Sequence, residues 1–146
     1  MKRRFTVLCA AASALAALLT AAPAASAKGS SDGPCTISKL VNASGGFADI
    51  PATSGRSSWC TLRVGARNDA VWILQYNIRT CYPDFGLSAP DGIYGPETEA
   101  SVRQIQRMRG LTIDGVYGPN TRMNMQVFWQ YTSTGTTNCL GIPDYV

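Results

Sequence analysis

The 146-residue chain contains no histidine, and its only glutamates are Glu97 and Glu99. The absence of histidine excludes Ser-His-Asp and Cys-His hydrolases, in which an imidazole is the general base. It also excludes histidine-ligated zinc hydrolases. A glycosidase needs two facing carboxylates, and two glutamates that lie two residues apart on a helix do not face each other. The composition therefore argues against an enzyme and predicts no metal or cofactor.

The chain also lacks a strong charge of one sign outside its first residues. The formal net charge is +4, but Lys2, Arg3 and Arg4 supply most of this excess, and the remaining acidic and basic residues almost balance. A surface that binds nucleic acid needs concentrated positive charge. We therefore do not expect nucleic acid as a partner.

Only one long hydrophobic run is present, and it lies near the start of the chain. Three basic residues precede an alanine-rich apolar run over residues 5–22, and residues 25–27 (ASA) have the small side chains of a cleavage site. This order is typical of a secretory signal peptide. The run is long enough for a membrane anchor, but Pro23 and the small residues favour cleavage. We expect residues 1–27 to be removed and the rest to be exported, with no membrane segment left.

Cleavage would remove Cys9 and leave four cysteines. An even number of cysteines in an exported chain predicts two disulfides, and no pair has the short spacing of a zinc site. The sequence does not decide among the three possible pairings. We favour Cys60–Cys81, which would join the two ends of a helical region, and Cys35–Cys139, which would tie the N-terminal arm to the C-terminal tail.

Three stretches in the middle of the chain have the apolar spacing of helices. The apolar faces are Val71, Leu74 and Ile78; Val102, Ile105 and Met108; and Met125, Phe128 and Trp129. The flanking segments 28–58 and 132–146 are rich in glycine, serine and threonine and show no sustained period. The sequence thus predicts a mostly α fold: a small three-helix domain over residues 59–131, with a linker and irregular arm before it and a tail after it.

One phrase is written twice within this domain. Residues 91–98 read DGIYGPET and residues 114–121 read DGVYGPNT. Asp-Gly is a turn signal, the second glycine permits a sharp bend, and the proline after it suits the first position of a helix. Each copy therefore predicts a turn that leads directly into a helix. Two such turn–helix units predict a pseudo-repeat packed on the first helix.

These blocks, in this order, resemble the three-helix peptidoglycan-binding domain family of bacterial cell-wall enzymes. The family pattern runs V-x-x-L-Q, then D-G-x-x-G-x-x-T-x-x-A-V-x-x-x-Q, then G-L-x-x-D-G-x-x-G-x-x-T. Residues 71–75, 91–106 and 110–121 match the three blocks, with Ser101 in place of the usual alanine and Ile105 in place of an aromatic residue. The resemblance implies binding without chemistry, and the chain resembles a stand-alone secreted wall-binding protein.

The two turns supply the candidate binding residues. Tyr94 and Tyr117 hold equivalent places, and exposed rings there would rim a shallow groove for a sugar or a stem peptide; packing on their own turns is the equal alternative. Further candidates are Asp91, Asp114, Thr98, Thr121, Asn120, Gln75 and Arg103. The aspartates and threonines are expected mainly to build the turns, and Arg103 could meet a stem-peptide carboxylate or pair with Glu99. Trp72 lies off the main apolar face and is the best of the tryptophans as a sugar platform, although packing is the commoner role.

We therefore predict a monomeric, secreted or cell-wall-associated bacterial protein that binds peptidoglycan without cleaving it. A second reading from another class is a secreted inhibitor, whose arms would contact a protein partner while the turns serve only as scaffold. A third reading is a cell-wall hydrolase, which the missing general base disfavours.

Overall fold

The computed structural model describes residues 30–146. The expected signal peptide lies outside these residues. The elements in chain order are β1 (Ile37–Ala43), β2 (Gly46–Ala52), α1 (Asp69–Cys81), the 3-10 turn η1 (Pro83–Phe85), α2 (Pro96–Met108), α3 (Pro119–Asn124), β3 (Gln126–Tyr131) and β4 (Thr137–Gly141). None of the helices in this part of the chain has the length and apolarity needed to cross a membrane.

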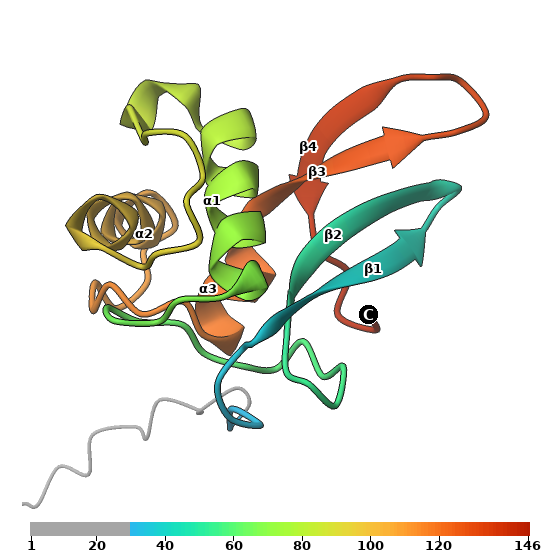
Figure 1. The fold of residues 1–146 in the computed structure, drawn as a ribbon. Coiled ribbons are helices and arrows are strands. Elements are labelled where there is room, and N and C mark those ends of the chain that lie inside the picture. The colour runs from blue at the N-terminus through green and yellow to red at the C-terminus, as the bar shows by residue number, and fades with distance from the viewer. Residues whose placement is uncertain (1–29) are drawn as a thin grey trace, which may run out of the picture.

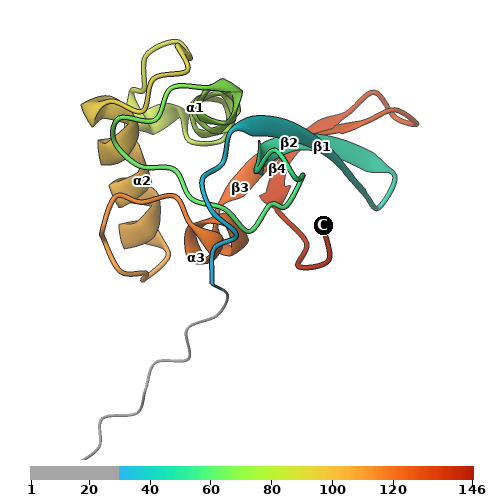
Figure 2. The same ribbon diagram turned by 60° about the horizontal axis from the view of Figure 1, so that its bottom comes forward.

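The four strands form one antiparallel sheet in the order β1-β2-β3-β4. It consists of two hairpins, one from each end of the described chain, with the helices between them in sequence. Strands β2 and β3 pair through only two residue pairs, Gly46 with Tyr131 and Phe47 with Gln130. Figure 1 shows the hairpins on one side of α1 and helix α2 on the other, and Figure 2 shows the same division from below. Helix α1 is thus the central element of the molecule.

The prediction of a mostly α, three-helix domain with irregular arms is therefore wrong. Residues 37–52, expected to be irregular, form the β1–β2 hairpin, and their two-residue turn at Ser44 and Gly45 has φ values of 50° and 79°. Positive φ at both central residues is the backbone of a type I′ turn, whose twist suits a hairpin. The C-terminal tail likewise supplies a strand, β4, which pairs along β3.

The third expected helix is much shorter than predicted. Helix α3 ends at Asn124, and the apolar residues that follow belong to β3. Val127 and Trp129 are buried, whereas Gln126, Phe128 and Gln130 are more exposed. This alternation has the period of two that marks a strand, so the run is half-buried on alternate residues rather than apolar all round a helix.

The first two helices form where the sequence predicts them. The Asn68 side chain accepts the Val71 N–H at 3.1 Å and caps the start of α1, and Pro83 follows its end. Helices α2 and α3 both begin with proline, at Pro96 and Pro119, after an extended glycine. A missing N–H costs nothing at that position.

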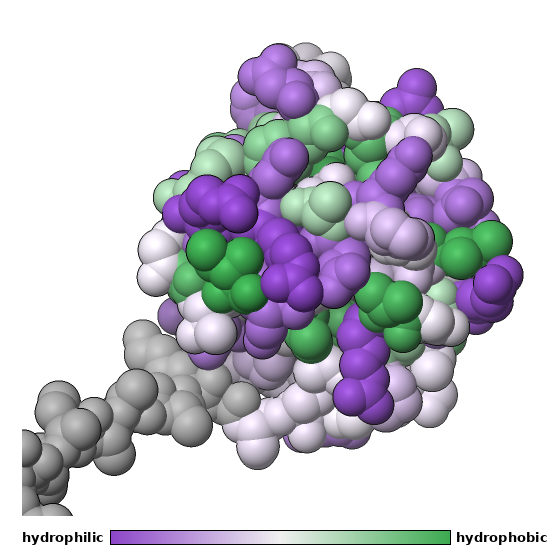
Figure 3. Space-filling model, turned by 90° about the vertical axis from the view of Figure 1, so that its left-hand side faces the viewer, coloured by the Kyte–Doolittle hydropathy of each residue, from purple (hydrophilic) through white to green (hydrophobic). Residues whose placement is uncertain are grey.

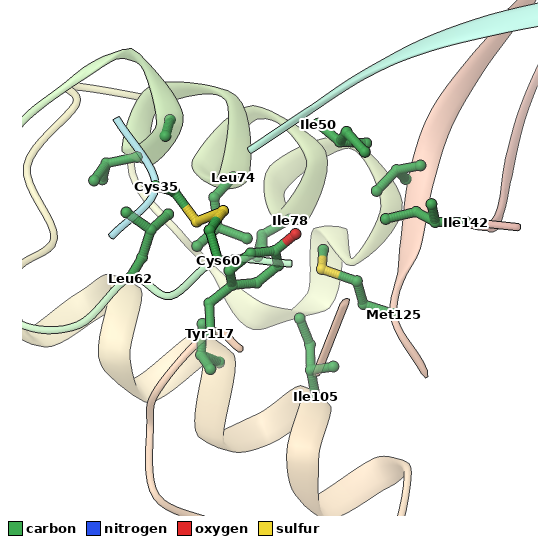
Figure 4. Close-up of a cluster of buried hydrophobic side chains, with 14 of the residues drawn as sticks. Cys35, Ile50, Cys60, Leu62, Leu74, Ile78, Ile105, Tyr117, Met125 and Ile142 are labelled. Carbon is green, nitrogen blue, oxygen red and sulfur yellow. A yellow bond between two sulfur atoms is a disulfide. The ribbon is translucent and has the colours of Figure 1, made fainter. Parts of the chain in front are cut away.

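A single hydrophobic core joins the helical part to the sheet. Leu74 and Ile78 of α1 lie between Ile50 of β2 and Ile105 of α2, with Met125 completing the cluster (Figure 4). The side chain of Arg122 is also buried: its guanidinium lies 5.4 Å from the ring centre of Trp59 and donates to the Val146 oxygen. Burial lowers the pKa of this guanidinium. Residues 142–146 are thereby held against the core.

Two disulfides join Cys35 to Cys60 and Cys81 to Cys139. The pairing favoured from the sequence was wrong. The backbone of Cys35 bonds to Thr61, with its N–H 2.9 Å from the Thr61 carbonyl, so Cys60 lies beside Cys35 with a Cα–Cα distance of 5.1 Å. Cys81 ends α1 near β4, which carries Cys139 at 5.5 Å. The first disulfide therefore joins the segments before and after the β1–β2 hairpin, and the second ties the β3–β4 hairpin to the end of α1.

Peptide mapping under non-reducing conditions should recover one fragment pair that links Cys35 with Cys60 and another that links Cys81 with Cys139. Replacing Cys35 and Cys60 together by alanine should lower the free energy of unfolding by about 3 kcal/mol, since this disulfide closes a loop of 25 residues in the unfolded chain. A fragment pair containing Cys60 and Cys81 would contradict the structure.

Candidate functional site

The first repeated turn is held by a glutamine of helix α1. The buried Gln75 donates from Nε2 to Asp91 Oδ1 at 2.8 Å, to the Ile93 carbonyl at 3.0 Å and to Thr98 Oγ1 at 3.0 Å. Its Oε1 accepts the backbone N–H groups of Asp91 at 3.0 Å and Gly92 at 2.9 Å. One side chain therefore holds both ends of the turn, and we call this set of contacts a glutamine clamp.

The second repeated turn has the same clamp, supplied by helix α2. Gln106 donates from Nε2 to Asp114 Oδ1 at 2.7 Å, to the Val116 carbonyl at 3.0 Å and to Thr121 Oγ1 at 3.2 Å. Its Oε1 accepts the Gly115 N–H at 2.9 Å. The two clamps correspond residue by residue except at one contact, the Asp91 N–H bond to the glutamine oxygen, which the first clamp alone makes. Each helix thus holds the turn that comes next in the chain, and this explains why the phrase is repeated.

The aspartate and glycine of each turn have structural roles. Asp91 Oδ1 accepts the Ile93 N–H at 2.8 Å, and Asp114 Oδ1 accepts the Val116 N–H at the same distance. This contact to the residue two positions on is that of an Asx turn. Gly92 has a φ of 73°, as has the glycine after Asp114, and a side chain at either place would be strained.

The clamp also changes the acidity of Asp91. The Gln75 amide, and after it the Ile93 N–H, hold the pKa of this carboxyl below its usual value of 3.8. A lowered pKa in the folded state means that the ionised carboxylate stabilises the fold above pH 3.8. This contribution is lost as the pH falls through the lower, folded-state pKa.

The two repeated tyrosines are buried rather than exposed. Tyr94 retains 1% of its accessible surface and Tyr117 retains 0%, and burial raises the pKa of both hydroxyls. The Tyr94 hydroxyl donates to the Gly115 carbonyl at 2.7 Å, so the ring of the first turn contacts the backbone of the second. The prediction that exposed rings rim a groove is therefore wrong. Both rings are packed, but Tyr94 contacts the second turn and not only its own, as the alternative had assumed.

The tyrosines are covered because residues 62–67 run along both turns. Leu62 and Tyr117 exchange two backbone hydrogen bonds, at 2.8 and 2.9 Å. Farther along, Gly65 donates to the Tyr94 carbonyl at 3.1 Å, and Tyr94 donates to the Ala66 carbonyl at 2.9 Å. These contacts join segments that are distant in sequence, so the repeated phrase alone does not reveal that its tyrosines are internal.

An open pocket lies beside each turn. Both pockets are lined by the clamp glutamine and by the aspartate, apolar residue, glycine, proline and threonine of the repeat. The first pocket, at residues 91–98, is completed by Leu87, Ser88, Ala89 and Glu97. The second pocket, at residues 114–121, is completed by Ser31, Thr61, Leu111, Thr112 and Asn120. Exposed side chains at the edges of both pockets offer carboxylate and hydroxyl groups, and Asn120 adds an amide at the second pocket.

The candidate residues from the sequence divide between these pockets and other places. Gln75, Asp91 and Thr98 border the first pocket, and Asp114, Thr121 and the exposed Asn120 border the second. Arg103 lines neither. Its Nη2 lies 2.8 Å from Glu99 Oε1, and its Nη1 donates to the Ile113 carbonyl at 3.0 Å. Arg103 thus forms the predicted pair with Glu99, and its guanidinium lies against the start of the second repeated turn.

Sequence reasoning missed the clamp role of Gln106 and the outer walls of the pockets. The signal for the clamp is the shared spacing of residues 71–75 (VWILQ) and 102–106 (VRQIQ), in which a glutamine follows the same apolar pattern. The pocket walls at 87–89 and 111–112 come from loops without a period, so no pattern predicts their position. In the described part of the chain, no three histidine, cysteine, aspartate or glutamate side chains are grouped so that they could hold a metal ion.

A comparison with known families matches this part of the chain. Residues 67–125 match the family described as "Putative peptidoglycan binding domain". The resemblance stated from the sequence is thereby confirmed for the segment from just before α1 to the end of α3. This segment includes both clamps and makes up less than half of the chain. A comparison with curated proteins gave no match.

The two tyrosine hydroxyls should respond differently to removal. Tyr94→Phe should lower the free energy of unfolding by about 1 kcal/mol, because its buried hydroxyl makes a hydrogen bond. Tyr117→Phe should be neutral or stabilising, because the Tyr117 hydroxyl is buried and contacts no acceptor in residues 30–146. Urea unfolding of both variants checks this, and an equal cost for the two would contradict the described hydrogen bonding.

Breaking one clamp should loosen one turn. Gln75→Leu and Gln106→Leu should each cost about 1–3 kcal/mol, because buried polar partners in the turn lose their contacts. Amide hydrogen exchange should accelerate at Gly92 in the first variant and at Gly115 in the second. Gln104→Leu on α2 is the matched control, since Gln104 takes part in neither clamp. Equal acceleration at both glycines in either clamp variant would show that the clamps do not act separately.

Proposed function

We propose that the protein binds peptidoglycan without cleaving it, using the two pockets beside the clamped turns. The family match supports peptidoglycan as the general partner. The observation that carries the proposal is the duplication of the site: two pockets of matching composition border two adjacent turns. A polymer with a repeating unit offers the same chemical groups more than once, and two weak contacts on one rigid scaffold then reinforce each other.

The setting of the protein fits an oxidising compartment outside the cytoplasm. One disulfide closes the base of the first hairpin and the other ties the second hairpin to α1, and such bonds persist in secreted chains. Together with the signal-like first 27 residues, this supports export to the cell wall as part of the proposal. We further propose that the exported protein acts as a monomer.

The absence of histidine from the sequence supports binding rather than hydrolysis. An assay for reducing sugars released from purified cell-wall sacculi distinguishes the two functions. Sugar release by the wild-type protein would favour the hydrolase. The inhibitor reading assigned contact to the arms, which the structure places in the sheet, so deletion of an arm would disturb the fold. Substitutions at the pockets therefore replace arm deletions as the test.

The sharpest variants are Glu97→Ala and Asn120→Ala. The two residues occupy equivalent positions in the repeats, both are exposed, and each lines one pocket. Each substitution should weaken retention on insoluble sacculi about fivefold, since a hydrogen bond contributes about 1 kcal/mol. Asn138→Ala on β4 removes an exposed amide far along the chain from both turns and serves as the control.

Chitin and cellulose show whether retention is selective. Unchanged retention of the folded Glu97→Ala, Asn120→Ala double variant would exclude the pockets as the binding site. A folded, oxidised wild-type protein that sacculi do not retain would overturn the proposed function and direct the search to a protein partner.

A further inference from the structure

A row of three aromatic side chains crosses the outside of the molecule. The rings of Trp72 and Tyr76 on α1 are stacked, with centroids 5.5 Å apart and an interplanar angle of 8°. Tyr76 contacts Phe128 of β3 edge to face at 5.9 Å. Trp72 is 45% exposed, and Tyr76 and Phe128 are half-buried. We call these three residues the aromatic row, and none of them belongs to the hydrophobic core.

The aromatic row begins next to the first clamped turn. A Cβ placed on Gly92 would lie 3.8 Å from the Cβ of Trp72. Trp72 is three residues before Gln75 and four before Tyr76, so these side chains are neighbours on the surface of α1. The row therefore extends the surface beside the first pocket toward the sheet.

The matching position in the second repeat shows what is particular about Trp72. Because Gln75 corresponds to Gln106, Trp72 corresponds to Arg103. Arg103 lies over Gly115 and is occupied by its contacts with Glu99 and the Ile113 carbonyl. Among the described residues, Trp72 makes no comparable polar contact and stacks only on Tyr76. Nearly half of its side-chain surface is therefore exposed to solvent beside the first clamped turn.

The charges around the first pocket decide which ligand this surface suits. Asp91 and Glu97 line the pocket, and no lysine or arginine lines either pocket. Carboxylate oxygens accept hydrogen bonds from hydroxyl groups, but they repel another carboxylate. A stem peptide that ends in a carboxylate is therefore disfavoured, whereas a hydroxyl-rich sugar meets acceptors in the pocket and a flat apolar surface on the indole.

The surroundings also argue against a protein partner on the aromatic row. Asp69 and Arg79 are exposed on the same helix on either side of it. Elsewhere, on the face around α2, apolar side chains form separate patches among hydrophilic ones (Figure 3). A stable protein interface needs about 800 Å² of surface from each partner, and a narrow row with charged neighbours provides much less.

We infer that the aromatic row is a glycan-binding subsite, in which Trp72 stacks on a sugar ring of the peptidoglycan glycan strand while the first pocket accepts its hydroxyl groups. This inference rests on the proposed function and assigns the glycan, rather than the stem peptide, as the recognised part. Trp72 sets this specificity through its exposed face. Tyr76 and Phe128 hold the indole in place.

The test compares two soluble probes with the full oxidised protein: peptide-free glycan strands whose lactyl carboxyl groups are blocked as amides, and free stem peptides. Wild-type protein should bind the glycan strands, and Trp72→Ala should weaken this binding about tenfold, as expected for the loss of one aromatic contact. Trp72→Phe should retain most of the affinity. Tyr145→Ala is the matched control, because Tyr145 is an exposed aromatic residue, 77% accessible, outside the aromatic row.

A second readout does not depend on a large substitution. Glycan strands should protect tryptophan fluorescence from acrylamide in the wild type and in Trp59→Phe, but not in Trp72→Phe, because Trp129 is already buried. Unchanged glycan affinity in a folded Trp72→Ala variant would overturn the inference. Binding of stem peptides but not of glycan strands would also overturn the inference, and it would leave the proposed function standing. If sacculi do not retain the wild-type protein at all, both the inference and the proposed function are overturned.

Discussion

The buried glutamine clamp is the interaction on which the rest of the structure depends. A turn that contains Asp-Gly and leads into a proline-started helix leaves several backbone groups without partners. Gln75 supplies both donors and acceptors to these groups from the preceding helix, and Gln106 does the same for the next turn. The cost of an unsatisfied buried group is larger than the gain from an ordinary hydrogen bond. The position of each helix is thus linked to the position of the turn after it. The open pockets lie on the solvent side of these clamped turns.

The parts of the fold that depend on local pattern were predictable from the sequence. The apolar spacing of α1 and α2, the Asn68 cap and the glycine–proline helix starts each act within a few residues of the chain. The strand β3 was wrongly predicted as helix because Val127, Phe128 and Trp129 are all apolar. Only the structure shows that buried and more exposed side chains alternate along this run. The β1–β2 hairpin was missed although Ser44 and Gly45 stand at its turn, because its strands mix polar and apolar residues without a strong period.

The parts that depend on tertiary contacts were not predictable. The disulfide pairing follows from the contact of residues 33–35 with Thr61 and from the approach of β4 to the end of α1, and neither contact leaves a mark in the local sequence. The exposure of Tyr94 and Tyr117 was misjudged for the same reason, since residues 62–67 cover them. For the candidate site, the sequence identified the two turns, and its resemblance to the peptidoglycan-binding domain family is confirmed over residues 67–125. The division of roles within the turns, with clamps inside and pockets outside, required the structure.

The short pairing between β2 and β3, which we call the seam between the two hairpins, has a consequence for how the chain folds. Strands β2 and β3 meet through only two residue pairs, and the whole helical part lies between them in sequence. Each hairpin and each clamped turn is made of near neighbours, whose contacts close quickly, whereas joining the hairpins must close a long loop. We expect the helical unit to act as a folding nucleus and the seam to close last. Oxidation of Cys81 with Cys139 would then fix the second hairpin once it has docked, so this disulfide would form only after the sheet is complete.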